Sequence, residues 1–202
     1  MNKDIKDNIE KLFIQNRGYA RTGELIKKGI HSSYIYELES EGIITKVKRG
    51  LFKLTEYSFE EENELVEVSK IIPNGVVCLL SALSFYEFTT YNPWEYYVAV
   101  FRKSRTPVIS EYPPIKILYF SEKQYSIGLT TIEIAGNEVK IYDREKTICD
   151  CVRYRNKIGM DIFKEALKEY LKYKEKDLSK LMKYAENLGV KKVLKDYLEV
   201  LI

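Results

Sequence analysis

The sequence has little of what most enzyme active sites use. It has a single histidine, His31, which disfavours enzymes that use a histidine general base or a Ser-His-Asp triad. Its three cysteines are an odd count without the spacing of a disulfide framework, which favours a reducing compartment and gives no four-ligand zinc set. Neither the G-x-x-x-x-G-K-[ST] loop nor the G-x-G-x-x-G loop is present. These absences predict a protein with no catalytic site, no metal ion and no cofactor.

Long apolar runs are also missing. No stretch approaches the roughly 18 consecutive apolar residues of a membrane-spanning helix. The N-terminus, MNKDIKDNIEKLF, mixes acids with lysines and does not resemble a signal peptide. With 45% hydrophobic and 31% charged residues, the chain has the composition of an ordinary globular protein. We therefore expect a cytoplasmic protein without a membrane partner.

Charge is distributed unevenly, although the net charge is only +3. Residues 1–57 hold 11 basic and 8 acidic side chains, residues 58–140 hold 7 and 11, and residues 141–202 hold 15 and 11. An acidic middle therefore separates two basic ends, a pattern that permits two basic surfaces.

The first 57 residues predict three short helices followed by a hairpin. Apolar residues spaced for a helix run from Ile5 to Asn16, Thr22 can cap a second helix, and Ser32 or Ser33 can cap a third. Each predicted helix ends at a glycine, namely Gly18, Gly29 and Gly42. This is the spacing of a helix-turn-helix core.

In the following segment, IITKVKRGLFKL, the apolar period changes from helical to alternating. Alternation places Lys46 and Lys48 on one face, and Arg49-Gly50 forms a plausible tight turn. Residues 1–57 are thus expected to form a winged helix-turn-helix domain with a basic wing.

Residues 58–202 are expected to form a second, mixed α/β domain that ends in a helical bundle, which makes the chain an α+β protein. The predicted order is an acidic helix at 58–70, a buried apolar helix at 76–88, strands within 96–142, and four helices from residue 144. Asp143 and Asp177 are suited to cap two of those helices.

The predicted third helix and wing are the elements that would meet DNA, because a helix in the major groove reads bases while nearby cations bind phosphates. Solvation of an ordinary charged surface explains the same residues, and Glu37 and Glu39 would repel phosphate if they faced the groove. The predicted DNA-binding residues are Arg21, Ser32, Ser33, Tyr36, Lys46, Lys48, Arg49 and Lys53.

Two features invite an enzymatic interpretation. Asp143, Glu145 and Asp150 are close in sequence, and paired carboxylates serve acid–base or magnesium chemistry, but helix capping and dipole stabilisation explain Asp143 and Glu145 better. Cys149 and Cys151 would point about 200° apart on a helix, so a shared metal is disfavoured.

The order of these elements resembles the AbiEi family of bacterial antitoxins over nearly the whole chain. The segments that carry the resemblance are GYARTGELIKKGIHSSYIYELESEGIITKVKRGLFKL, GVVCLLSALSFYEF, PWEYYVAV and VKIYDREKTICDCVRYRNKIGMDIFKEALKEYL. The most specific run extends from Tyr142 to Tyr170 and contains a D-R-E-K-T-like element. Glu37 and Glu39 depart from the basic recognition helices frequent in the family.

The resemblance implies a dual role. The N-terminal domain would bind inverted repeats in the promoter of its own operon, and the C-terminal domain would oppose a nucleotidyltransferase-like toxin encoded beside it. A plain regulator whose C-terminal domain dimerises or senses a ligand remains an alternative. A basic surface for a partner or for more DNA would use Lys164, Lys168, Lys172, Lys176 and Lys180.

Overall fold

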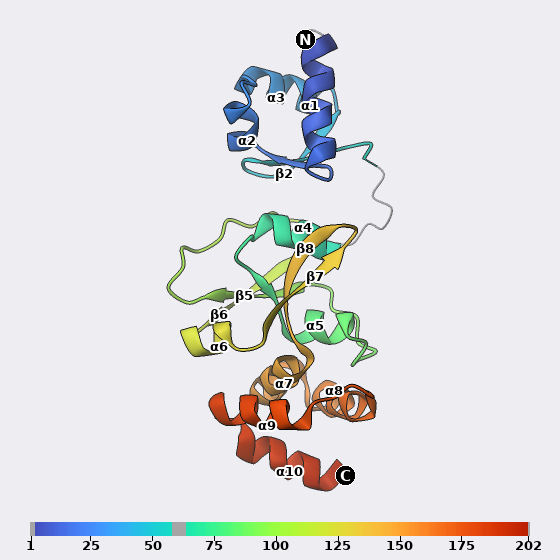
Figure 1. Cartoon of the computed structure of the whole chain (residues 1–202), viewed down its shortest axis with the longest axis vertical. Coiled ribbons are helices and arrows are strands. Elements are labelled where there is room, and N and C mark those ends of the chain that lie inside the picture. Colours follow the sequence, from blue (N-terminus) through green and yellow to red (C-terminus); the bar gives the residue numbers. More distant parts are fainter. Residues whose placement is uncertain (1–2, 58–63, 202) are drawn as a thin grey trace. The chain divides into compact units, whose positions relative to one another are not determined.

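The computed structural model describes residues 3–57 and 64–201, and it confirms an α+β protein with two sheets (Figure 1). Its contacts divide the chain into two compact units. The first comprises Met1–Pro73, Thr106–Pro113 and Glu133–Glu138, and the second comprises the three remaining segments. The predicted domain boundary at residue 57 stays a prediction. The first part of the acidic helix predicted at 58–70 falls outside the described residues.

The first unit contains a three-stranded antiparallel sheet with β3 in the centre, the helices α1 to α3 that share a core with it, and a fourth helix, α4. Apolar side chains from the helices, among them Phe13 and Leu38, pack with Phe52 of the sheet in one core. The elements are α1 (Lys3–Gln15), β1 (Tyr19–Arg21), α2 (Thr22–Lys27), α3 (Ser32–Ser40), β2 (Ile44–Lys48), β3 (Leu51–Leu54) and α4 (Glu64–Ile71).

The predicted caps of two helices were wrong. Thr22 is the first residue of α2 rather than its cap; the capping position belongs to Arg21, whose backbone N–H donates to the Glu24 carboxylate at 2.8 Å. His31, not a serine, caps α3, since its ring Nδ1 accepts from the Ser33 N–H at 3.3 Å. In both helices the N-cap is the extended residue immediately before the first residue that had been predicted as a cap.

The second unit is built around a five-stranded sheet of order β6-β5-β4-β8-β7, whose β7–β8 turn is grouped with the first unit. Val76 and Val77 form a strand, so the predicted helix at 76–88 starts only at Leu79. The elements are β4 (Val76–Val77), α5 (Leu79–Phe85), β5 (Tyr96–Phe101), β6 (Ile115–Phe120), α6 (Glu122–Ser126), β7 (Leu129–Ile134) and β8 (Asn137–Tyr142).

Four further helices follow the sheet: α7 (Arg144–Ile158), α8 (Met160–Lys172), α9 (Leu178–Asn187) and α10 (Lys191–Leu201). They gather into one layer, seen in orange and red in Figure 1. Phe163, Tyr170 and Leu181 are fully buried in the core that this layer shares with α5. Asp143 and Asp177 cap α7 and α9 as predicted. Among the described residues, no helix has the length and apolarity needed to cross a membrane.

Candidate nucleic-acid interface

Helix α3 presents the polar face that was predicted to meet DNA. Ile35 and Leu38 turn inward, whereas the Tyr36 side chain is 69% exposed. The Ser33 hydroxyl lies 2.8 Å from His31 Nδ1, so it belongs to the cap that fixes the start of α3. Ser32, Ser33 and Tyr36 thus lie at the N-terminal part of one helix, where backbone N–H groups also favour an anion.

The β2–β3 hairpin separates two lysines that alternation had placed together. Lys46 pairs with Phe52, which faces the helices, but the register shifts at Val47 and Lys48 pairs with Leu51. A bulge of this kind adds one residue to a strand and reverses the side-chain alternation after it. Lys46 therefore lies exposed on the helix side of the edge strand, and the predicted common face of Lys46 and Lys48 was wrong.

On the opposite face of the sheet, Arg21 and Lys48 flank Leu51 in one row across the three strands. Their cationic groups reach the end of α4: an Arg21 Nη donates to the Lys70 carbonyl at 2.6 Å, and Lys48 Nζ donates to the Ile71 carbonyl at 2.7 Å. Cations are stabilising at a helix C-terminus, where carbonyls lack partners within the helix.

The surroundings of Lys48 are consistent with this structural task. Lys48 Nζ also donates to the Val108 carbonyl at 3.0 Å. Burial, and then the nearby Arg21 charge, lower the pKa of Lys48 below its ordinary value. Its ammonium is therefore committed to carbonyl oxygens of the first unit.

Lys53, on the same face, is also engaged within the first unit. Its Nζ lies 3.0 Å from the Glu67 carboxylate of α4, which accepts from the Tyr19 hydroxyl at 3.4 Å as well. Val47 of β2 and Leu51 of β3 are buried. Their apolar character, within a hairpin predicted to be a basic wing, was the sequence signal that a further element covers this face.

Arg49 stands at the turn of the hairpin and is exposed. Gly50 follows it with φ of +78°, a left-handed conformation that glycine adopts without a steric penalty. Among the eight predicted residues, three therefore hold α4, and the other five lie on α3, the edge strand and the turn. The five are Ser32, Ser33, Tyr36, Lys46 and Arg49.

The lysines predicted to form a second basic surface do not share one environment. Lys164 and Lys168 are exposed on α8 beside a hollow of about 420 Å³, whereas Lys172 pairs with Glu169 at 2.6 Å. Lys176 donates to the Tyr173 carbonyl at 3.3 Å. Lys180 bridges two carboxylates, those of Asp143 at 3.0 Å and Glu145 at 3.2 Å.

The carboxylates considered for catalysis are tied up in packing. Burial lowers the pKa of Lys180, but its hydrogen bonds to Asp143 and Glu145 outweigh burial and raise the pKa above its ordinary value. Asp150 is 1% exposed and pairs instead with the buried Lys146 at 2.5 Å. The three acids therefore do not converge on an accessible cleft.

No group of three or more potential metal-ligating side chains lies together within residues 3–57 and 64–201. Cys78, Cys149 and Cys151 are buried free thiols, and burial raises the pKa of each. Thiols of this kind are structural rather than reactive.

Part of the first unit matches a known protein family. Residues 7–55, from α1 to the end of the hairpin, match the family model described as "Transcriptional regulator, AbiEi antitoxin". The match confirms, for this segment, the resemblance predicted from the sequence. No curated protein matches the chain.

Among solved structures, a mycobacterial protein resembles the fold over most of the chain. The crystal structure of the RV2827C protein from Mycobacterium tuberculosis aligns with a TM-score of 0.52 at 11% identity, covering 95% of this chain and 79% of that chain. At this identity the likeness concerns the fold alone.

Proposed function

From the match of residues 7–55 to the AbiEi antitoxin regulators, we propose that this chain is a DNA-binding autorepressor and antitoxin. The three helices and the β2–β3 hairpin act as a winged helix. Helix α3 enters the major groove and the hairpin binds the adjacent backbone. The observation that supports the proposal is that Tyr36 of α3, Lys46 of the edge strand and Arg49 of the hairpin turn are all exposed and all lie within the matched segment.

We infer that the predicted contacts fall into two classes with different roles. Lys46 and Arg49 would bind phosphates, and Ser32, Ser33 and Tyr36 would meet bases or phosphates from α3. Arg21, Lys48 and Lys53 would contribute by holding α4 against the sheet. The bound DNA would be the promoter of the protein's own operon.

This division gives the first prediction. Replacing Arg49 by alanine is expected to weaken DNA binding by about 1–2 kcal/mol at moderate salt and to reduce the slope of log K against log salt by about one. The matched control is Lys53→Ala, which removes a cation paired with Glu67 and is expected to leave the salt slope unchanged. Fluorescence anisotropy at several salt concentrations measures both. Equal losses for the two variants would remove the hairpin turn from the interface.

For residues 58–202 we propose the antitoxin role, directed at a nucleotidyltransferase-like toxin encoded in the adjacent gene. Co-expression is expected to rescue cells from the product of that gene, and a chain carrying Arg49→Ala is expected to rescue equally well when both genes are driven by an independent promoter. Failure of the wild-type chain to rescue, with both proteins folded and expressed, would contradict this role. In that case the plain regulator is the better account.

A further inference from the structure

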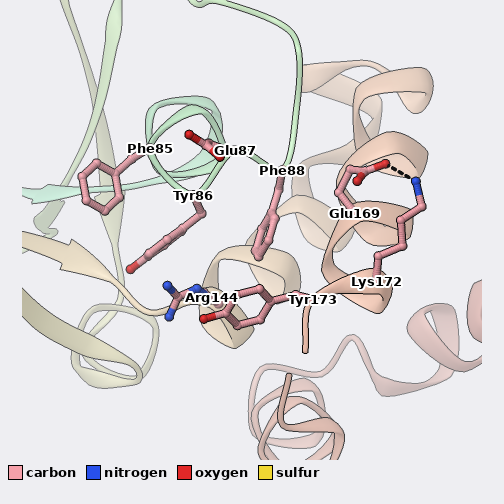
Figure 2. A pocket seen from close by; sticks show the side chains of 8 residues that line it. All are labelled: Phe85, Tyr86, Glu87, Phe88, Arg144, Glu169, Lys172 and Tyr173. Atoms are coloured by element: carbon pink, nitrogen blue, oxygen red, sulfur yellow. Dashed lines mark hydrogen bonds and ion pairs between the residues drawn. The ribbon is translucent and has the colours of Figure 1, made fainter. Parts of the chain in front are cut away.

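A pocket of about 540 Å³ opens in the second unit between the end of α5 and helices α7 and α8 (Figure 2). This volume lies within the range of small-molecule sites. The lining residues are Phe85, Tyr86, Glu87, Phe88, Arg144, Glu169, Lys172 and Tyr173. None of them belongs to α3 or the hairpin, and only Lys172 was among the lysines predicted to form a second basic surface.

Arg144 is the distinctive group in this pocket. Its guanidinium carbon lies 4.8 Å from the centroid of the Tyr86 ring and 4.6 Å from that of Tyr173, as Figure 2 shows. Both rings are fixed: the Tyr86 hydroxyl donates to the Tyr142 carbonyl at 2.8 Å, and the Tyr173 hydroxyl donates to Glu175 at 2.7 Å. The guanidinium is therefore held in place by aromatic contacts.

The N–H groups of the Arg144 guanidinium differ from those of the other arginines on α7 in their hydrogen bonding. Within residues 3–57 and 64–201, its guanidinium has ring contacts but neither a carboxylate nor a carbonyl partner. By contrast, Arg153 and Arg155 on the same helix donate to the Leu188 and Val152 carbonyls. A half-buried guanidinium that keeps its donors unused is prepared to receive an acceptor, and its planar fork matches a carboxylate in bidentate geometry.

The other charges in the pocket limit the charge of the ligand. Lys172 is neutralised by Glu169 at 2.6 Å, and Glu87 adds a further negative charge. Among the lining residues, a phosphate dianion or a polyphosphate would meet the Arg144 cation and the opposing Glu87 carboxylate, with Lys172 already paired to Glu169. A ligand with a single carboxylate needs only the Arg144 cation. The rings of Phe85 and Phe88 supply the apolar part of the pocket lining. Glu87 has φ of +57°, the left-handed conformation common just after a helix C-cap, and the Phe88 N–H that follows it donates to the Leu83 carbonyl of α5 at 2.9 Å.

We propose that this pocket binds a small monocarboxylic acid with an aromatic or branched apolar body. The carboxylate pairs with the Arg144 guanidinium, and the apolar body lies against Phe85 and Phe88. Because the site lies outside the DNA-binding segment, it gives the second unit a ligand-binding activity that does not depend on the proposed repressor role.

The test is a titration of the ¹⁵N-labelled full chain, followed by NMR, with phenylacetate and isovalerate as probes. Both are expected to cause saturable shifts at Phe88, Arg144 and Tyr173, with a dissociation constant of roughly 1 mM. Phenylacetamide, the neutral isostere, and inorganic phosphate are expected to bind at least about tenfold more weakly. These ligand comparisons need no variant and remain informative whatever a substitution does to folding.

Arg144→Gln is expected to reduce phenylacetate affinity by about tenfold or more, whereas Arg102→Gln, at an exposed arginine beyond β5, is expected to leave it unchanged. Arg144→Lys keeps the charge but loses the fork and is expected to fall between them. The proposal is overturned if neither acid gives saturable shifts up to about 10 mM. It is also overturned if phosphate or the amide binds as well as the acid, or if Arg144→Gln retains full affinity.

Discussion

Replacing Lys146 by methionine is expected to lower the free energy of unfolding by about 3–5 kcal/mol, because it leaves the Asp150 carboxylate buried without a counter-charge. Lys146 is fully buried, and its Nζ lies 2.5 Å from Asp150 Oδ2. The same ammonium lies 4.2 Å from the centroid of the Tyr142 ring and 4.8 Å from that of Phe120. The other carboxylate oxygen, Asp150 Oδ1, has no hydrogen-bond partner in the described structure.

The dependence of this loss on pH identifies its cause. Burial raises the pKa of Asp150 from 3.8 to about 6 even with Lys146 beside it. In Lys146→Met the missing ammonium raises the Asp150 pKa further. Near pH 5 the Asp150 carboxyl of the folded variant is therefore protonated, whereas that of the unfolded chain is still mostly ionised. The native state then binds the extra proton, and stability rises as pH falls through this window. The deficit of Lys146→Met is therefore expected to be smaller at about pH 5 than at about pH 7.5.

Urea unfolding at the two pH values measures the effect, with Lys164→Met as the matched control. Lys164 is exposed on α8, so its replacement is expected to change stability by at most about 0.5 kcal/mol. A deficit for Lys146→Met that matches the control, or one that is the same at both pH values, would show that the buried charge is not its source.

Replacing Glu145 by alanine is expected to cost about 2–4 kcal/mol of unfolding free energy, since this carboxylate joins several elements of the helical layer. Glu145 Oε1 accepts from the buried Tyr170 hydroxyl of α8 at 3.0 Å and from the Asp177 N–H at 3.4 Å, while Oε2 pairs with Lys180 of α9. Alanine would leave the Tyr170 hydroxyl buried without its acceptor, which costs the full desolvation of that group.

The control for this variant is Glu199→Ala, which removes an exposed carboxylate of α10 and is expected to change stability by at most about 0.5 kcal/mol. Thermal and urea unfolding of both variants provide the comparison. If Glu145→Ala has the same free energy of unfolding as the control, the Glu145 carboxylate has no structural role. A catalytic role for Asp143 and Glu145 would then have to be tested.

Much of the fold could be predicted because its signals are local. Apolar spacing located most of the helices, positive-φ glycines such as Gly42 and Gly189 ended them, and Asp143 and Asp177 were recognised as caps from their position alone. The short helix α6 was missed, because it lies within the segment 96–142 that was predicted to form strands. The two N-terminal caps were missed because His31 and Arg21 are not the residues that capping preferences favour.

The candidate site was less predictable because it depends on contacts between distant segments. The apolar Val47 and Leu51 indicate that some element covers this face, but no residue near Lys48 in sequence reveals the bulge at Val47 or identifies α4 as that element. A lysine that completes a helix C-terminus and a lysine that meets phosphate look alike in a linear pattern. Arg144 was equally unpredictable. In the sequence it is only a residue in the first turn of a helix, and its contacts with the Tyr86 and Tyr173 rings come from distant segments.

The proposed repressor role requires the first unit to bind the promoter of the protein's own operon. The most direct test measures, by fluorescence anisotropy at several salt concentrations, binding of the wild-type chain to the DNA just upstream of its gene and to a scrambled duplex. The account predicts a preference for the upstream DNA and an affinity that falls steeply with salt. Absence of binding to either duplex at low salt would contradict it and would assign α3 and the hairpin to protein contacts instead.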